Sequence, residues 1–260
     1  MNIAFSLHPK PVTTFLLKVI GFLALAGLVS CYLLNVAGLP SVFGLVPLFD
    51  LNEEFNIPSF YSGFAIWFSA FLLRSIYLFE KKNHGQSPHY WKALFFVFLF
   101  LGLDEIFIIH EKFARIEPYL RDVIHIHNAN RYWVIPYGVF TLVAGLYFLP
   151  FYLRLQKATR LRFTVAGLVY VSAAFGLEII SSMVASIVDL SYLAIDLFEA
   201  AEEIIEMLGI ALFIRALLYY FLEKGITPSV SLKVQMESRK QDDAKVQIKE
   251  KPRTLASEPQ

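Results

Sequence analysis

Six long apolar runs divide the chain and are separated by shorter polar segments. A hydrocarbon core about 30 Å thick requires about 20 residues of helix to cross it. Lipid offers no partner to open backbone groups, so a chain of this kind is expected to cross the bilayer as helices. The predicted spans cover residues 13–36, 59–79, 92–111, 133–153, 163–187 and 200–222.

The basic residues between the runs predict the direction of the chain. Residues 80–92 contain three lysines, residues 154–162 contain four basic residues and no acid, and the segment from 224 onward is also rich in basic residues. Cytoplasmic links carry more Lys and Arg than outer links, so these three segments are expected to be cytoplasmic. Residues 36–58 and 189–199 have no Lys or Arg and are expected to face outward. Both termini are therefore predicted to be cytoplasmic, although the basic residues within 112–131 fall on the outer side and conflict with this topology.

The segments outside the spans are irregular or polar. Residues 38–58 combine Pro40, Pro47 and Pro58 with apolar residues, which predicts an interfacial or re-entrant segment over the outer mouth. From residue 225 the chain is polar with mixed charge, which is typical of disorder. The predicted organisation is a transmembrane helical domain over residues 1–224 and a disordered cytoplasmic tail over residues 225–260.

Composition agrees with an all-α, polytopic transmembrane helical bundle. The chain is 57% hydrophobic and only 17% charged, with a mean hydropathy of +0.55, whereas about a quarter of the residues of a soluble domain are charged. The lipid bilayer is thus the expected partner. The sequence has no dense basic face, which argues against nucleic-acid binding. The single cysteine, Cys31, excludes an intramolecular disulfide and a cysteine-based metal site.

Several acids interrupt the apolar runs. They are Asp104 and Glu105 in the third run, Glu178 in the fifth, and Glu202, Glu203 and Glu206 in the sixth. An ionised carboxylate in hydrocarbon costs about 3 kcal/mol on insertion scales. Such groups persist when they are paired, protonated, wetted or bound to a cation. They are therefore the first candidates for a functional site.

The predicted topology places these acids at similar depth. The third and fifth spans run outward and the sixth starts from outside, so a rise of about 1.5 Å per residue puts all the acids in the outer third. Together with Glu199, the acids of the sixth span form one acidic stripe. Two simpler interpretations stay open. Glu202 and Glu203 could be first-turn acids favoured by the helix dipole, and Asp104 and Glu178 could be protonated acids bonded to a neighbouring helix.

Clustered carboxylates with one imidazole suit Mg, Mn, Fe or Zn. The predicted metal ligands are Asp104, Glu105, Glu178, Glu202, Glu203 and Glu206, and the predicted catalytic bases are His110 and Glu111. His125 and His127 could cap such a site from the outer link, or could be exposed loop histidines.

One helix carries a resemblance. The segment formed by Leu103, Asp104, Glu105, His110 and Glu111 resembles that of uncharacterised bacterial multi-pass membrane proteins. This resemblance covers a single helix and implies no activity. It makes the bacterial cytoplasmic (inner) membrane the expected location.

Three functions fit these observations. The first is a divalent-metal site near the extracytoplasmic side, in a metal-dependent hydrolase acting on a lipid or lipid-linked substrate. The second is a cation or proton-coupled transporter that uses the same acids. The third is a non-enzymatic membrane assembly protein whose acids only pair helices. The sequence does not decide between enzyme and non-enzyme, and it leaves the metal, the substrate and the oligomeric state undetermined.

Overall fold

The structure is a computed structural model that describes residues 2–85, 87–113 and 133–233. The chain divides into a helical unit, Leu7–Pro228, and a second unit formed by Met1–Ser6 and Ser229–Gln260. In the second unit, strand β1 (Asn2–Ser6) pairs with the antiparallel strand β2 (Ser229–Lys233). Residues 229–233 were predicted to belong to a disordered tail, and this strand pair was not anticipated.

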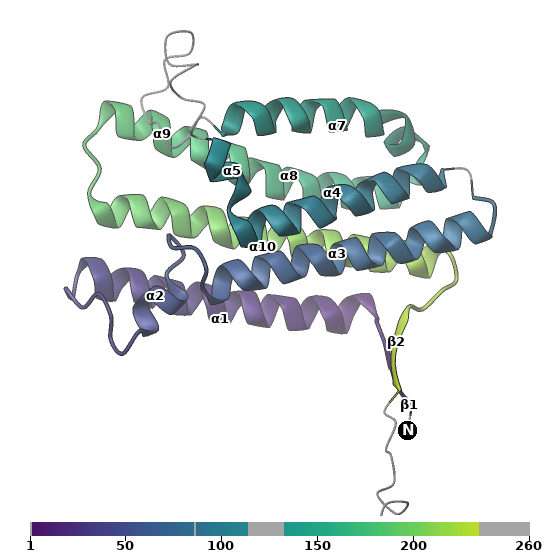
Figure 1. Cartoon of the computed structure of the whole chain (residues 1–260), viewed down its shortest axis with the longest axis horizontal. Coiled ribbons are helices and arrows are strands. Elements are labelled where there is room, and N and C mark those ends of the chain that lie inside the picture. Colours follow the sequence, from purple (N-terminus) through teal and green to yellow (C-terminus); the bar gives the residue numbers. More distant parts are fainter. Residues whose placement is uncertain (1, 86, 114–132, 234–260) are drawn as a thin grey trace, which may run out of the picture. The chain divides into compact units, whose positions relative to one another are not determined.

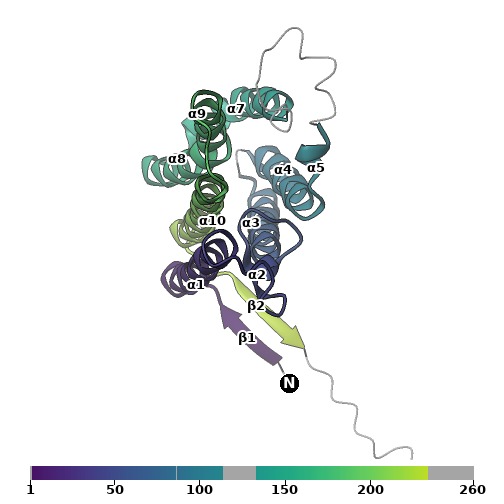
Figure 2. The same cartoon turned by 90° about the vertical axis from the view of Figure 1, so that its left-hand side faces the viewer.

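The helical unit contains a series of long helices that lie side by side (Figures 1 and 2). The elements are α1 (Pro9–Asn35), α2 (Leu45–Phe49), α3 (Ile57–Lys82), α4 (Pro88–Phe107), α5 (Ile109–Lys112), α7 (Val134–Arg154), α8 (Lys157–Val171), the π-helix η3 (Ser172–Leu177), α9 (Glu178–Ile187) and α10 (Tyr192–Glu223). Helix α10 packs against α1, α3 and α8 and lies at the centre of this unit.

Local sequence explains where two of these helices begin. The side chain of Asn56 accepts a hydrogen bond from the Ser59 backbone N–H, and the Ser59 hydroxyl accepts one from the Asn56 N–H. This reciprocal pair satisfies two backbone donors at the start of α3. Ser191 caps α10 in a similar way by accepting from the Ala194 N–H at 3.3 Å.

Five helices are long and apolar enough to cross a membrane. They are Pro9–Asn35, Ile57–Lys82, Val134–Arg154, Lys157–Ala185 and Tyr192–Glu223. Helix α4 is 20 residues long, but every stretch of 18 residues in it contains Lys92, Asp104 and Glu105, so it is not among the five. It packs closely along α3, where Trp67 Nε1 donates to the Leu99 carbonyl at 3.4 Å.

Two predicted helix boundaries were wrong. The predicted span 92–111 is not one helix, because α4 ends at Phe107 and Ile108 adopts a left-handed conformation with φ of 50°. Helix α10 begins at Tyr192 rather than at residue 200. Glu202 and Glu203 therefore lie about three turns inside α10, and the interpretation that they are first-turn acids is also wrong.

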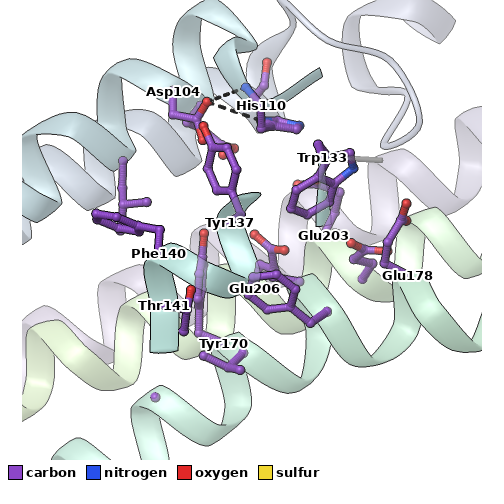
Figure 3. Close-up of a pocket in the computed structure, with 18 of the residues that line it drawn as sticks. Asp104, His110, Trp133, Tyr137, Phe140, Thr141, Tyr170, Glu178, Glu203 and Glu206 are labelled. Carbon is purple, nitrogen blue, oxygen red and sulfur yellow. Dashed lines mark hydrogen bonds and ion pairs between the residues drawn. The ribbon is translucent and has the colours of Figure 1, made fainter. Parts of the chain in front are cut away.

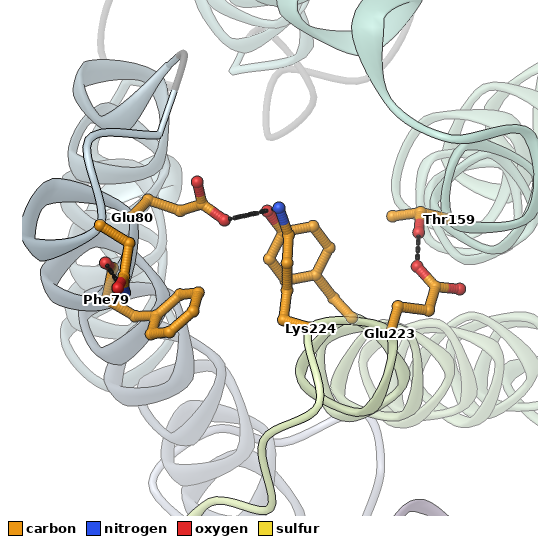
Figure 4. A network of polar contacts seen from close by, with 7 residues as sticks. Phe79, Glu80, Thr159, Glu223 and Lys224 are labelled. Carbon is orange, nitrogen blue, oxygen red and sulfur yellow. Dashed lines mark hydrogen bonds and ion pairs between the residues drawn. The ribbon is translucent and has the colours of Figure 1, made fainter.

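The two ends of the helical unit meet. The Leu7 N–H donates to the Pro228 carbonyl at 2.8 Å. At the same end, buried Glu80 accepts from the Tyr220 hydroxyl at 2.6 Å and lies 3.0 Å from Lys224 Nζ (Figure 4). Both Thr159 and Arg162 contact Glu223 nearby. These contacts fix α3, α8 and α10 to one another at the end opposite the acids.

Candidate functional site

A cavity of about 750 Å³ lies between α4, α7, the α8–η3–α9 helix and α10, with the segment before α3 at its rim. Nine acids line it: Glu53, Glu54, Asp104, Glu105, Glu178, Glu199, Glu202, Glu203 and Glu206. His110 lines it too, and none of the described lining residues is a lysine or an arginine. The structure thus brings all six predicted metal ligands to one cavity. Figure 3 shows Asp104, Glu178, Glu203 and Glu206 among them.

Three of these acids form the tightest group. The carboxylate oxygens of Glu178, Glu199 and Glu202 lie within 4.8 Å of one another. Glu199 and Glu202 are one turn apart on α10, and Glu178 reaches them from the start of α9. Glu178 and Glu202 are buried, and Glu199 is partly buried. Glu199 was missing from the predicted ligands because its segment was expected to be an outer link, although its spacing to Glu202 carried the signal.

The π-helix η3 ends directly before Glu178. A π turn holds one more residue than an α turn, so it changes the face that the following residues present. Such turns occur frequently at functional sites. The sequence predicted one regular helix here, and the small residues Ala173, Ala174 and Gly176 were the only local sign of an irregularity. The direction of the Glu178 side chain therefore depends on η3.

Asp104 has a different environment from the group of three. Its Oδ1 accepts a hydrogen bond from the His110 backbone N–H at 2.7 Å and lies 3.5 Å from His110 Nδ1 (Figure 3). The imidazole also packs edge-on against the rings of Trp133 and Tyr137, at centroid distances of 5.1 and 6.2 Å. Asp104 thus orients His110 across the break after α4. The backbone of Glu111 lies in α5, but its side chain is outside the described part of the chain.

The remaining acids lie deeper between α4 and α10. The charges of Glu105 and Glu203 interact across the cavity, and Glu203 also interacts with His110. One turn further into α10, Glu206 is hydrogen-bonded to the Tyr170 side chain of α8. Gly209 allows this approach, because a Cβ there would lie 2.8 Å from the Tyr170 backbone nitrogen.

A second polar cluster holds the segment between α1 and α3 against α10. Asp196 accepts from the side-chain amides of Asn35 at 2.6 Å and of Asn52 at 2.9 Å. The Asn52 N–H in turn donates to Asp50 Oδ1 at 3.1 Å. Burial raises the pKa of the Asp50 carboxyl, the charge of Asp196 adds to the shift, and the Asn52 hydrogen bond opposes it. The cluster positions the segment that brings Glu53 and Glu54 to the cavity.

Comparison with known proteins identifies the family. Residues 16–221 match the family described as a domain of unknown function (DUF8692). The chain belongs to the DUF8692 family. No curated protein and no solved structure matches it. The matched segment runs from within α1 to near the end of α10 and includes every acid of the cavity.

In this DUF8692 chain the cavity continues past the acids as an apolar arm. Its walls there are Leu94, Val97 and Leu101 of α4, Phe140, Ala144 and Phe148 of α7, and Phe163 of α8. The cavity is therefore polar at one end and apolar at the other. The predicted capping residues His125 and His127, and the basic residues from 115 to 131, lie outside the described residues.

Proposed function

We propose that this chain is a membrane protein that binds a divalent metal ion through Glu178, Glu199 and Glu202. The observation that carries the proposal is the separation of at most 4.8 Å between their carboxylate oxygens. Carboxylate oxygens lie about 2.0–2.2 Å from Zn²⁺ and about 2.3–2.6 Å from Ca²⁺. Two oxygens on one ion are then at most about 4.4–5.2 Å apart. The bound of 4.8 Å lies slightly beyond the limit for Zn²⁺, so the three carboxylates would move a little closer together to share an ion of that size.

We further propose that α4 is a sixth span and that the acids face the extracytoplasmic side. Helix α4 lies along α3 for most of its length, which supports its insertion with the other five. The end where Leu7 meets Pro228 carries Lys81, Lys82 and Lys224, as expected of a cytoplasmic end. The bacterial cytoplasmic membrane is proposed from the resemblance of the Asp104–Glu111 segment alone.

The chemistry best suited to this cavity is hydrolysis of an ester or phosphoester bond in a lipid or lipid-linked substrate. A bound divalent ion would supply a water whose pKa is lowered to about 7. His110 is the proposed general base, because it lines the acidic end of the cavity and its Nδ1 lies 3.5 Å from Asp104 Oδ1. The water oxygen would bond to the carbonyl carbon or phosphorus as its proton passes to His110. The bond from that atom to the ester oxygen would break, and the departing oxygen would take the proton from His110.

Metal analysis tests the proposal. Protein purified in detergent without added metal is expected to carry about one ion of Mg, Mn, Fe or Zn per chain. Glu178→Gln keeps the shape of the side chain but loses its charge, and should lose the ion. Glu223→Gln is the matched control, since Glu223 lies outside the cavity beside Thr159 and Arg162. Metal-free wild type, or equal metal in both variants, would overturn the proposal.

A cation or proton-coupled transporter has weaker support. Glu206 and Tyr170 extend the polar path inward, but the described cavity walls beyond them are apolar. Transport would need a polar path to the opposite end. Uptake of a labelled cation into proteoliposomes, abolished by Glu206→Gln, would favour this function. An assembly protein would instead tolerate the single change of any one acid to its amide.

A further inference from the structure

The apolar arm of the cavity is long compared with its polar end. On α4 it extends from Asp104 to Leu94, ten residues of helix, which corresponds to about 15 Å. On α7 it extends from Tyr137 to Phe148, which corresponds to about 16 Å. Each length is about half of a hydrocarbon core about 30 Å thick. The arm is thus as long as the apolar part of one bilayer leaflet.

The same region is open toward the side of the bundle. A second cavity of about 370 Å³ lies between α4 and α7 and is lined by apolar and aromatic residues such as Phe96, Phe100 and Pro136. Val97, Tyr137 and Phe140 line both cavities. The two cavities therefore meet at one wall, between two helices that run along the bundle.

Helix α7 presents an apolar face on its other side. Leu142, Val143 and Leu146 are 64%, 58% and 63% exposed, as expected for side chains that contact lipid tails. Phe151 is the one α7 residue that is buried, against Tyr90 and Trp91 of α4. Near Phe140 the two helices are joined less closely. Among the described residues at this level, the only pair of aromatic rings that links α7 to α4 is Phe140 and Phe100, with ring centroids 6.3 Å apart. Phe96, Phe100 and Phe140 line the second cavity and are 53%, 39% and 41% exposed, so the passage between α4 and α7 opens on the apolar outer surface of these helices.

We propose that the apolar arm receives one hydrocarbon chain of a membrane lipid, which enters sideways between α4 and α7. The lipid headgroup then lies beside the acids and the proposed metal ion, so the inference rests on the proposed function and identifies the substrate as a lipid bound by its chain. The volume of about 750 Å³ falls within the range of about 300–1,000 Å³ that small-molecule sites occupy.

The shape of the cavity favours a lipid over a soluble apolar molecule. A soluble ligand would enter from water through the acidic end, where nine carboxylates would oppose an apolar group. A lipid already has its chain in hydrocarbon and its headgroup at the polar level. Moving it sideways therefore exposes little apolar surface to water.

Glycines in the arm allow a sharp test. Gly145 of α7 and Gly167 of α8 both line the cavity, and a Cβ at either position would meet nothing within 4 Å. Gly145→Trp should fill the arm, and replacing a helical glycine does not weaken the helix itself. Leu146→Trp is the matched control, because Leu146 is the next residue on α7 and lines neither cavity. Gly167→Leu blocks the opposite wall if Gly145→Trp fails to fold.

The probe is a phosphatidylcholine with one brominated acyl chain, mixed into the micelles that hold the full-length protein. Native mass spectrometry is expected to show one bound probe per wild-type chain, unchanged occupancy in Leu146→Trp, and occupancy reduced roughly tenfold in Gly145→Trp. No bound probe in wild type, or equal occupancy in the two tryptophan variants, would overturn the inference.

Metal content of the same samples separates the two proposals. Gly145→Trp protein that loses the lipid but keeps its ion supports both. Wild type that binds the lipid in the arm without any ion overturns the metal proposal and still supports the lipid site. Wild type that holds the ion but no lipid supports the metal proposal and overturns the lipid site.

Discussion

The His110 backbone N–H donates a 2.7 Å hydrogen bond to Asp104 Oδ1 across the left-handed turn at Ile108. Asp104 therefore stabilises the helix break as a capping side chain does. A positive φ is costly for a β-branched residue, so the turn persists only because its surroundings hold it. The placement of the His110 imidazole depends on this one carboxylate oxygen.

Asp104→Ala should accordingly lower the stability of the protein by about 1–2 kcal/mol, the usual loss when a capping side chain is removed. Asp104→Asn keeps an oxygen that can accept the same hydrogen bond and should lose less than half as much. Thermal unfolding in detergent measures both. If the asparagine and alanine variants unfold at the same temperature, the charge of Asp104, rather than its hydrogen bond, supports the break.

Removal of the proposed metal ion gives a second prediction. An ion that binds only the folded state stabilises it, by about 2.7 kcal/mol when its free concentration is 100 times the dissociation constant. A chelator should therefore lower the melting temperature of wild type. Glu178→Gln should melt at the same temperature with and without chelator, because the ion is already lost.

Glu223→Gln serves as the control and should respond to the chelator as wild type does, since Glu223 contacts Thr159 and Arg162 outside the cavity. A chelator effect of equal size in Glu178→Gln would place the ion elsewhere in the protein.

Close packing of α10 on α8 gives a third prediction. A Cβ on Gly209 would lie 2.8 Å from the nitrogen and 2.9 Å from the Cα of Tyr170, and backbone atoms cannot move aside easily. Gly209→Ala should destabilise the protein by about 1–3 kcal/mol, as overpacking does. Gly21→Ala is the matched control. A Cβ on Gly21 of α1 meets nothing within 4 Å, and this change should stabilise by about 0.4–1 kcal/mol.

Thermal unfolding of the two alanine variants side by side distinguishes packing from helix propensity. Equal effects of the two substitutions would mean that the helices do not approach closely at Gly209.

Apolar run length predicted the helices, since a bilayer imposes a minimum on every span. Helix ends were less predictable, because contacts from distant segments set them. The first turns of α10 contain Asp196 and were expected to be a loop. In the structure, Asn35 and Asn52 satisfy that carboxylate, and both are far from it in sequence.

The meeting of the acids could be expected from the sequence, because the predicted direction of each span put the acids at similar depth. The grouping within the cavity could not. It depends on the π-helix before Glu178 and on the early start of α10, which brings Glu199 to Glu202 and Glu178. Asp104, expected to be a ligand, lines the same cavity and also lies against His110, because the chain turns at Ile108.

The buried carboxyl of Asp50 gives a fourth prediction, concerning pH. Burial raises its pKa in the folded state above the ordinary value of 3.8, with a further contribution from the charge of Asp196. A raised carboxyl pKa means that the folded state binds the proton more tightly than the unfolded state. The stabilisation is thus fully present below about pH 4 and is lost as the pH rises through the folded-state pKa.

Asp50→Asn removes this titration while keeping an oxygen that can accept the Asn52 N–H. Relative to the variant, wild type should therefore lose stability as the pH rises above about 4, and the difference between their melting temperatures should become constant below about pH 4. Melting temperatures of both proteins across that range measure the effect. Wild type that instead gains stability over the variant with rising pH would mean that the Asn52 hydrogen bond to the ionised carboxylate outweighs its burial. The segment holding Glu53 and Glu54 at the cavity would then be fastened best when Asp50 is charged.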